Sequence, residues 1–343
     1  MQWGDLITLE YGKPIKDKES ANGPIPVYGT NGQIGTSHLK PLCEHPSFIL
    51  GRKGAYRGVH YSDTPFSVID TAFYAKPISD KVDLKWAYYK FLTYDINRMD
   101  SGSAIPSTDR YEIYSIDVDL PDLVTQRRVV SVLELLDNKI QDNNKINDNL
   151  EQQAQAIFRR EVLRNGELPP NWTTGSLLDI ADYLNGLAMQ KFRPIDGERG
   201  LPVLKIKELR QGFCDYSSEL CSPNIKPEFI VHDGDVIFSW SGSLLVDLWC
   251  GGTCGLNQHL FKVTSDKYPK WFYYAWTAHH LARFVAIAAD KATTMGHIKR
   301  EDLAKAEVII PDTTSMERIG GVIEPIYDLI INQRVENRRL SML

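Results

Sequence analysis

The stretch DRYEIYSIDVDLP (residues 109–121) decides the fold, because the chain repeats it as KREDLAKAEVIIP (residues 299–311). A second matching pair, DLKWAYYKF (83–91) and YPKWFYYAW (268–276), precedes the first pair in the same order. Each copy ends in a proline and is followed by a long, charged segment with periodic apolar residues. Two copies of one globular-plus-helical unit predict a pseudo-symmetric molecule, and such a molecule suits a target with two halves.

Length and composition restrict the class of protein. The chain has 343 residues, which is too many for one ordinary hydrophobic core and enough for two domains of typical size. Hydrophobic residues make up 43% of the chain and charged residues 24%, as in ordinary soluble proteins. The first residues, MQWGDLITLEYG, lack the basic start and apolar run of a signal peptide, and no stretch is apolar for the length of a membrane span. We therefore expect a cytoplasmic protein without a membrane partner.

Cysteine usage and net charge restrict the cofactors and partners only weakly. The five cysteines are odd in number and scattered, so we expect free thiols. Cys250, Cys254 and His259 lack the paired Cys-x-x-Cys spacing of structural zinc sites, so we expect no bound metal. The formal net charge of −5 is unlike the basic excess of most DNA-binding domains. Basic residues nevertheless gather in GRKGAYRG (51–58), so net charge does not exclude a nucleic-acid partner.

The pattern of elements predicts a mixed α/β (α+β) fold in each copy. Short runs of β-branched and aromatic residues alternate with Gly, Pro, Asn and Asp as far as Pro121, and one helix is predicted at 84–93. The same order returns from about Thr174, after the loop RNGELPPNW (164–172), which cannot continue a helix. The predicted parts are a first domain at 1–121, a helix at 122–165, a second domain at 166–311 and a second helix at 312–343.

The segments after the two prolines predict a pair of long helices. Their apolar residues are spaced alternately four and three apart, which is the seam of a coiled coil. Both seams turn polar twice, and in an antiparallel pair Asn143 would face Asn337 while Asn147 would face Gln333. The alternative is two unrelated surface helices whose polar residues face solvent. The predicted seam residues are Leu133, Leu136, Ile140, Asn143, Asn147, Leu150, Ile157, Ile319, Ile323, Ile330, Gln333, Asn337 and Leu340.

These helices are expected to act as a spacer between the two globular copies. The first, from about Thr125 to Leu163, would be close to 60 Å long at about 1.5 Å per residue. Two features break the symmetry of the pair. Pro325 is expected to kink the second helix. The second helix also ends at Leu343, which would leave residues 125–136 of the first helix without a coil partner.

No catalytic motif is found in the sequence. GRKGAYRG has its glycines in the wrong places for a phosphate-binding loop, and there is no metalloprotease motif or nucleophile elbow. His279 and His280 fall in an aromatic helix rather than in such a motif. Pro169-Pro170 lacks the preceding acidic or amide residue with which amino-methyltransferases hold an exocyclic amine. We therefore expect a chain that is not itself an enzyme.

Gly- and Ser-rich loops are the candidates for recognition. Small residues let a backbone approach a ligand, Arg or Lys suits guanine, Asn or Gln suits adenine, and Ser or Thr suits phosphate. Such loops are also ordinary turns more often than binding sites. The candidate DNA-contacting residues are Asn31, Gln33, Arg52, Lys53, Tyr56, Arg57, Ser101, Ser103, Ser107, Thr108, Arg110, Gln190, Lys191, Arg193, Ser239, Ser241, Ser243, Lys291, Thr293, Thr294, His297, Lys299 and Arg300.

The order of these motifs resembles the specificity (S) subunit of Type I restriction-modification systems. The motifs are WGDL (3–6), YGTNGQIG (28–35), GRKGAY (51–56), SGSAIP (101–106), QRRVV (126–130) and LDNKI (136–140). The resemblance implies two target-recognition domains in a pseudo-twofold repeat, joined by two long helices in an antiparallel coiled coil. It further implies double-stranded DNA with a bipartite target, two methyltransferase (M) subunits and restriction (R) motor-nuclease subunits as partners. The chain would then need no cofactor, because S-adenosylmethionine, ATP and Mg would be used by the partner subunits.

Two other functions remain open. One is a stand-alone DNA-modifying or DNA-cleaving enzyme, which would need its own methyl-donor pocket or metal-binding carboxylates. The other is a protein scaffold that does not bind DNA. Salt dependence separates DNA binding from the scaffold, because binding to phosphates weakens steeply as salt rises whereas an apolar interface responds little.

Overall fold

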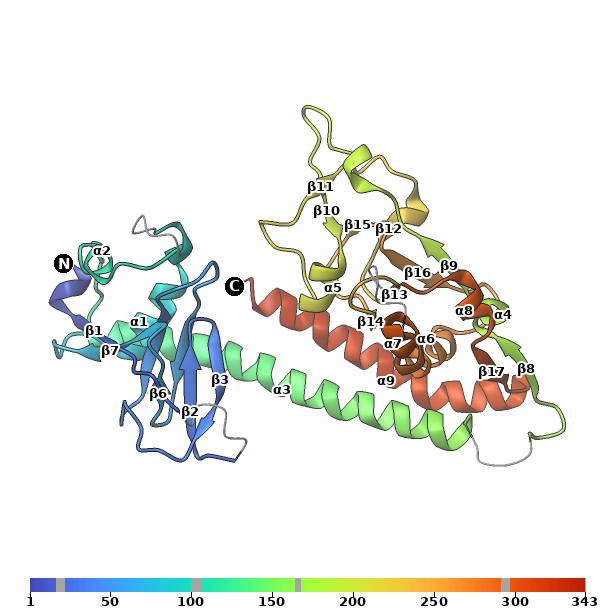
Figure 1. The fold of residues 1–343 in the computed structure, drawn as a ribbon, viewed down its shortest axis with the longest axis horizontal. Helices are drawn as coiled ribbons and strands as arrows, with labels where there is room; N and C mark the ends of the chain where they lie inside the picture. Colours follow the sequence, from blue (N-terminus) through green and yellow to red (C-terminus); the bar gives the residue numbers. More distant parts are fainter. Residues whose placement is uncertain (17–21, 100–105, 164–167, 291–296, 343) are drawn as a thin grey trace. The chain divides into compact units, whose positions relative to one another are not determined.

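The computed structural model describes residues 1–16, 22–99, 106–163, 168–290 and 297–342 (Figure 1). The chain divides into two compact units, Met1–Leu135 and Leu136–Leu343. Each unit contains one copy of the repeated sequence. The long helix α3 (Leu123–Glu161) begins in the first unit and ends in the second.

The first unit is built on a four-stranded antiparallel sheet with the strand order β1-β7-β4-β5. A smaller sheet, in the order β3-β2-β6, pairs β2 antiparallel to β3 and parallel to β6. The strands are β1 (Ile7–Tyr11), β2 (Ile25–Gly29), β3 (Gly32–Ser37), β4 (Ser47–Gly51), β5 (Val59–Ser62), β6 (Ser67–Val68) and β7 (Ala72–Pro77), and the helical segments are η1 (Trp3–Asp5), α1 (Leu84–Leu92), η2 (Ile96–Arg98) and α2 (Arg110–Tyr114).

The predicted helix at 84–93 is confirmed as α1. It begins at Leu84 because the Asp83 carboxylate accepts hydrogen bonds from the backbone N–H groups of the first turn. Its apolar face carries Trp86 and Phe91, which are buried against the larger sheet. The ring centroid of Phe91 lies 4.9 Å from that of Phe48 on β4. Aromatic packing of this kind fixes α1 to the sheet.

The second unit repeats this design. Its antiparallel sheet has the order β14-β13-β16-β9, and its smaller sheet has the order β11-β10-β15-β12. The strands are β8 (Thr173–Ser176), β9 (Asp182–Asn185), β10 (Leu201–Leu204), β11 (Leu220–Cys221), β12 (Ile230–Val231), β13 (Val236–Ser239), β14 (Leu245–Leu248), β15 (Cys254–Leu256), β16 (Leu260–Thr264) and β17 (Glu307–Ile310). The helices are α4 (Leu177–Ile180), η3 (Met189–Lys191), α5 (Ile206–Gln211), η4 (Pro227–Phe229), α6 (Lys270–His279), α7 (Leu281–Asp290), α8 (Arg300–Ala304) and α9 (Thr313–Leu340).

The two larger sheets have one topology. In each, the first strand pairs with the last strand, and the two intervening strands form a hairpin that completes the sheet. A glycine follows the first strand in both copies, because the backbone passes too close to a neighbouring carbonyl for any side chain. A Cβ atom on Gly12 would lie 2.0 Å from the Ile69 oxygen, and one on Gly186 would lie 2.3 Å from the Asn257 oxygen. The predicted repeat of one α/β fold is confirmed.

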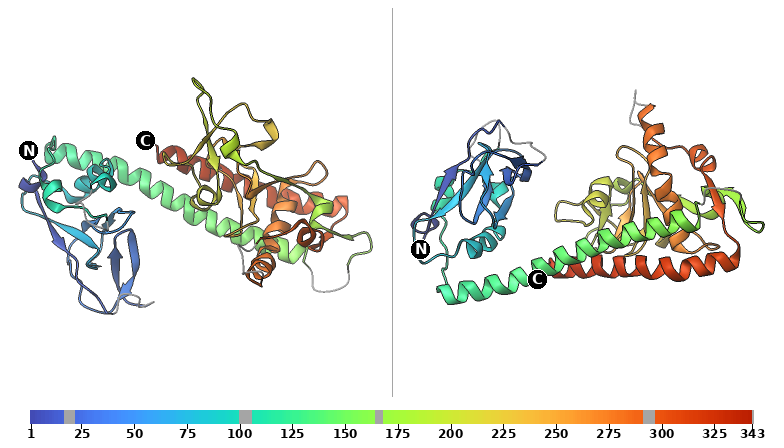
Figure 2. Two further views of the ribbon diagram at one scale, coloured as in Figure 1. Left: turned by 45° about the horizontal axis from the view of Figure 1, so that its top comes forward. Right: turned by 90° about the horizontal axis from the view of Figure 1, so that it is seen from below.

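Helices α3 and α9 form the predicted antiparallel pair within the second unit, where they run side by side (Figures 1 and 2). Near the end of α3, Glu161 forms an ion pair of 2.9 Å with Arg318 near the start of α9. Asn143 donates from Nδ2 to Oδ1 of Asn337 over 2.7 Å, at the polar position where the heptads predicted that these residues would meet. Pro325 is exposed, and α9 continues through it from Thr313 to Leu340.

Most of the predicted seam residues that belong to α9 are buried. Ile319, Ile323 and Ile330 are fully buried and belong to one core with Ala154 and Phe158 of α3. The core continues into the second domain through α6, so the helix pair and this domain fold as one unit. The other apolar seam residues are partly buried, namely Leu133, Leu136, Ile140, Leu150, Ile157 and Leu340.

The polar positions of the helix pair make a first testable prediction. Asn143→Leu should lower the stability of the second unit by about 1–3 kcal/mol, because it leaves the buried Oδ1 of Asn337 without its donor. The double variant Asn143→Leu/Asn337→Leu should recover this loss, since an apolar pair needs no partner. Thermal unfolding of the three proteins measures both effects. Equal losses in the single and double variants would show that the hydrogen bond does not stabilise the pair.

Gln126 anchors the start of α3 to the first domain. Its fully buried side chain accepts from the Asp83 backbone N–H at 2.8 Å and donates to the carbonyl groups of Lys81 and Pro121 at 2.8 and 2.7 Å. All three partners are backbone groups. The contact therefore depends on the fold of the domain and not on the side chains of its loops.

A second prediction concerns this anchor. Gln126→Leu should destabilise the first unit by about 2–4 kcal/mol, because it leaves three partly buried backbone groups without this partner. Hydrogen exchange of the β4 and β7 amides measures the change in that unit alone. Gln153→Leu, at an exposed position of the same helix, is the matched control and should change stability by less than about 0.5 kcal/mol. Unchanged protection in Gln126→Leu would contradict the anchor.

Candidate nucleic-acid interface

In the first domain the predicted loops meet where strands of the larger sheet end. We call this surface, which includes Tyr11, Arg52, Lys53 and Arg110, the first reading edge, and its equivalent in the second domain the second reading edge. The Thr30 hydroxyl bonds to the carbonyl groups of Lys53 and Thr71 at 2.6 Å each, which joins the loop after β2 to the loops after β4 and β6. The Thr108 backbone N–H donates to the Arg52 carbonyl at 2.8 Å, and Lys53 forms an antiparallel bridge with Ser107. Residues far apart in the sequence therefore share one surface.

Arg57 is not part of that surface, and the prediction that it contacts DNA is corrected. Its side chain is only 2% exposed. The guanidinium donates to the Asn97 carbonyl at 2.8 Å and to the Thr108 hydroxyl at 3.2 Å, and that hydroxyl donates to the Gly51 carbonyl at 3.1 Å. Arg57 and Thr108 thus hold the loops in position through buried hydrogen bonds. Because both side chains are buried, neither can contact a ligand at the surface.

At the centre of this edge, two partly buried arginines lie around one exposed tyrosine. The guanidinium carbon of Arg52 lies 4.7 Å from the ring centroid of Tyr11, and that of Arg110 lies 4.9 Å from the same centroid. Arg52 also lies 5.7 Å from the centroid of Phe73 and donates to the Asp70 carbonyl at 3.0 Å. Stacking of this kind holds a guanidinium in place while it keeps its charge.

The pKa of Arg110 supports a charged group at this edge. A hydrogen bond to the Tyr111 hydroxyl, 3.1 Å long, raises the pKa of Arg110 above its usual value. Among the described residues, no carboxylate forms an ion pair with Arg52 or Arg110. Lys53 and Tyr56 are exposed beside them. The edge is therefore a positively charged surface that carries aromatic rings.

The second domain builds the same edge from different residues. The Ile298 backbone N–H donates to the Trp240 carbonyl at 2.9 Å, and Ser241 forms an antiparallel bridge with His297. These two contacts repeat those that Thr108 and Ser107 make with Arg52 and Lys53 in the first domain. Trp240 is therefore the counterpart of Arg52.

Two further contacts support this equivalence. Tyr11 pairs with Phe73 in the first sheet, and Asn185 pairs with Phe261 in the second. The ring of Trp240 lies 5.7 Å from that of Phe261, and its Nε1 donates to the Asn185 side-chain oxygen at 2.9 Å. A cavity of about 460 Å³ opens here, lined by Asn185, Trp240 and Arg300 among others.

His259 and its neighbours extend the second edge. The Ser241 hydroxyl lies 3.1 Å from Nδ1 of His259, whose other ring nitrogen lies 3.3 Å from the amide of Gln258. Gln258 and His259 also line a cavity of about 440 Å³ with the predicted residues Gln190 and Arg193. Arg193 forms an ion pair of 3.0 Å with Glu219, and this pairing reduces the net positive charge of the cavity lining.

The remaining predicted residues differ in accessibility. Ser239 and Ser241 are buried, and the Ser239 hydroxyl donates to the Ser241 and Ser243 carbonyl groups, so these hydroxyls shape the turn instead of facing a ligand. Ser101, Ser103, Lys291, Thr293 and Thr294 lie outside the described residues. The exposed predicted residues are Asn31, Gln33, Gln190, Lys191, Arg193, Ser243, Lys299 and Arg300, with Ser107 and His297 partly buried.

Sequence reasoning did not include Tyr11, Asn185, Trp240, Gln258 and His259. Tyr11 and Asn185 are the last residues of β1 and β9, and their sequences are interpreted as part of the framework. Trp240 lies inside a serine-rich turn. A signal was present nonetheless. The glycine that follows each first strand marks the close approach of two backbones, and the residue before that glycine lies at this edge in both copies.

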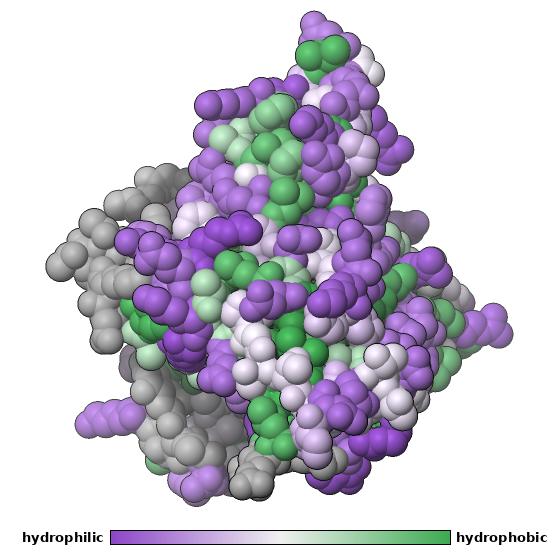
Figure 3. Space-filling view, turned by 90° about the vertical axis from the view of Figure 1, so that its right-hand side faces the viewer, coloured by the Kyte–Doolittle hydropathy of each residue, from purple (hydrophilic) through white to green (hydrophobic). Residues whose placement is uncertain are grey.

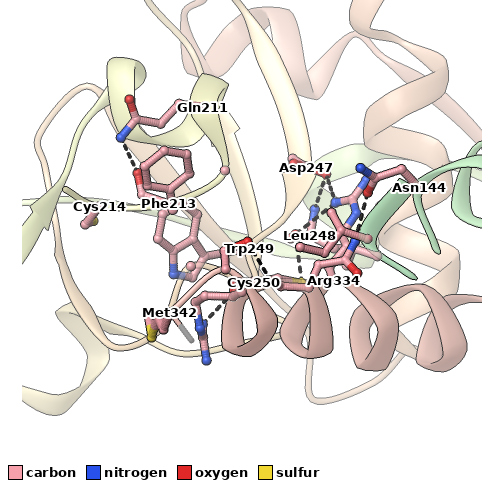
Figure 4. Close-up of a pocket in the computed structure, with 16 residues that line it drawn as sticks. Asn144, Gln211, Phe213, Cys214, Asp247, Leu248, Trp249, Cys250, Arg334 and Met342 are labelled. Carbon is pink, nitrogen blue, oxygen red and sulfur yellow. Dashed lines mark hydrogen bonds and ion pairs between the residues drawn. The ribbon is translucent and has the colours of Figure 1, made fainter. Parts of the chain in front are cut away.

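Another cavity of about 700 Å³ lies between α9 and the loop after α5 in the second unit. Figure 4 shows Arg334 directed toward Asp247, with Trp249 and Phe213 also lining the cavity. Although burial opposes its charge, Asp247 raises the pKa of Arg334, and their ion pair is 2.7 Å long. This arginine is neutralised by its partners, so the cavity does not add to the positive surface.

The cysteines show no grouping of metal ligands within the described ranges. Burial raises the pKa of Cys250 to about 11, so its thiol stays protonated at neutral pH. On the face drawn in Figure 3, hydrophobic residues (green) are mixed with hydrophilic ones (purple). In the part of the chain that the structure describes, no helix combines the length and apolar character needed to cross a bilayer.

Comparison with known proteins gives the family. Residues 1–152 match the family model described as the Type I restriction modification DNA specificity domain. The match includes the first edge and the first part of α3. The second copy of the fold extends the same architecture beyond the matched residues.

Two curated specificity subunits are similar to the chain. The Type I restriction enzyme MjaIX specificity subunit of Methanocaldococcus jannaschii is 22% identical over 74% of this chain, which covers 65% of that protein. The Type I restriction enzyme HindI specificity subunit of Haemophilus influenzae is 40% identical over 14% of this chain and 10% of its own length. The chain thus spans less than two thirds of the length of either relative.

One solved structure shares the fold. The crystal structure of the Type I restriction-modification S subunit from M. genitalium aligns with a TM-score of 0.61 at 12% identity, and the alignment covers all of this chain and 92% of that one. The layout of two α/β domains with a long helix after each is therefore shared with that solved structure.

Proposed function

We propose that the chain is the DNA-recognition subunit of a Type I restriction-modification complex and reads a bipartite target with one domain per half-site. The domains would be residues 1–121 and 166–311, with α3 and α9 as the spacer between the two reading edges. The observation that carries the proposal is that one fold, repeated with the same loop contacts, presents Arg52 in one copy and Trp240 in the other. Two such edges suit two different half-sites.

Catalysis is assigned to partner subunits. The methyltransferase and motor-nuclease subunits would use S-adenosylmethionine, ATP and Mg, and this chain would position them on the target. Exposed apolar residues of α3 offer a place for a protein partner, since Val132 is 57% and Leu135 is 69% exposed. The resemblance to specificity subunits favours the methyltransferase subunits as the proteins that cover them.

Salt dependence tests the proposal against a scaffold that does not bind DNA. The affinity of the full chain for duplex DNA should fall about 1,000-fold or more between 50 and 200 mM salt, as expected for roughly six or more phosphate contacts. Fluorescence anisotropy with a labelled duplex measures this change. Absence of binding at low salt, for the chain alone and with its methyltransferase subunit, would overturn the proposal.

A further inference from the structure

The two reading edges differ in charge at one equivalent position. Arg52 and Trp240 receive the same backbone hydrogen bond and lie at the same distance from equivalent phenylalanine rings. Arg52 is a cation beside Tyr11, whereas Trp240 is a neutral ring whose N–H is already bonded to Asn185. A feature that differs between copies of one scaffold is suited to reading what differs between two half-sites.

We infer that Arg52 reads a guanine in the half-site bound by the first domain, and that the second domain requires no guanine at the equivalent position. The inference rests on the proposed function and adds the base that is read. Arginine donates two parallel N–H groups to O6 and N7 of guanine in the major groove, which is the commonest specific contact between a side chain and a base. An indole with a single, occupied donor cannot make this contact.

The arrangement of Arg52 prepares it for this role. The guanidinium carbon lies 4.7 Å from the Tyr11 ring centroid and 5.7 Å from that of Phe73, and the Asp70 carbonyl accepts from one of the five N–H donors. Donors at its edge remain for a ligand. A second guanidinium, that of Arg110, lies within 5 Å of the same tyrosine ring, and no described carboxylate neutralises either one. Two neighbouring positive charges favour a ligand that carries several hydrogen-bond acceptors, such as the O6 and N7 atoms of guanine.

Arg110 has a different role, because its counterpart is also an arginine. Arg110 is the first residue of α2, and Arg300 is the first residue of the equivalent helix α8. A residue that is the same in both copies is suited to a group that is the same in both half-sites. The DNA backbone provides that group, so Arg110 and Arg300 contact phosphates.

Selection from a randomised duplex library, with the full chain and the variant Arg52→Gln, tests the assignment. The wild type should select two half-sites, and Arg52→Gln should lose one guanine from one half-site and keep the rest. Replacing that guanine with 7-deazaguanine removes N7 and should weaken the wild type roughly 5- to 150-fold, with little effect on Arg52→Gln. Arg110→Gln should weaken all sequences alike and reduce the salt slope by about 1. Lys40→Ala, which removes an exposed charge elsewhere in the domain, should select the wild-type sequence.

A gain-of-function variant keeps the test decisive if Arg52→Gln impairs folding. Asn185→Tyr/Trp240→Arg places the first domain's pair on the second edge and should add a guanine to the second half-site. An unchanged selected sequence in Arg52→Gln would overturn the inference and leave the proposed function standing. Loss of the entire first half-site, together with no guanine gained by the double variant, would also overturn it. If the wild type selects no sequence at all, the proposed function fails as well.

Discussion

A 25-residue helical insertion between Leu135 and Leu136 is expected to widen the unread gap of the target by about 11 base pairs. The insertion adds about 37 Å to α3 at about 1.5 Å per residue, and duplex DNA rises about 3.4 Å per base pair. It is nearly seven full turns of an α-helix, so the two domains keep their rotation about the helix axis. It is also close to one turn of DNA, so both half-sites still face the protein. The insertion point is where the first compact unit ends and the second begins.

The expected change is large for the original target. With the wild-type gap only one half-site can be bound at a time, and the loss of several base contacts should weaken binding roughly 100-fold or more. Methylation mapping, or selection from duplex libraries with variable gaps, measures the new gap directly. A 14-residue insertion is the control. It adds about 21 Å, or about 6 base pairs, which turns the second half-site to the opposite face of the duplex, so no gap should restore full affinity.

Exchange of the first domain alone should change one half of the recognised sequence and leave the other half intact. Residues 1–121 would be replaced with the corresponding domain of a specificity subunit that has a different target. The graft is feasible because Gln126 holds the first domain through backbone groups, which a domain of the same fold also supplies. Selection should return a hybrid sequence, and affinity for the original target should fall by about 1–3 kcal/mol for each base pair that no longer matches. If both halves change, the two domains read DNA jointly.

The repeat and the helix pair could be predicted from the sequence because both depend on local patterns. Heptad spacing placed Asn143 opposite Asn337, and the two residues are hydrogen bonded. The matching segments around Trp86 and Trp271 predicted one fold twice, and the two larger sheets share one strand order. Such patterns are strong because burial of periodic apolar residues determines these elements almost alone.

The reading edge was harder to predict, because long-range contacts decide which polar residues are exposed. Arg57 belongs to the same basic loop as Arg52, yet Asn97 and Thr108 bury it while Tyr11 holds Arg52 at the surface. Nothing in the spacing of GRKGAYRG separates the two arginines. Tyr11 reaches the edge only because β1 pairs with β7, so its role follows from strand pairing and not from its own neighbours in the sequence.

The central claim is that two copies of one fold read two different half-sites. Sequence selection with the wild-type chain tests it most directly, with its methyltransferase subunit added if binding requires that partner. Two specified blocks of different sequence, separated by a gap of fixed length without base preference, are the predicted result. A single continuous block, or two blocks related by exact inverted symmetry, would contradict the account.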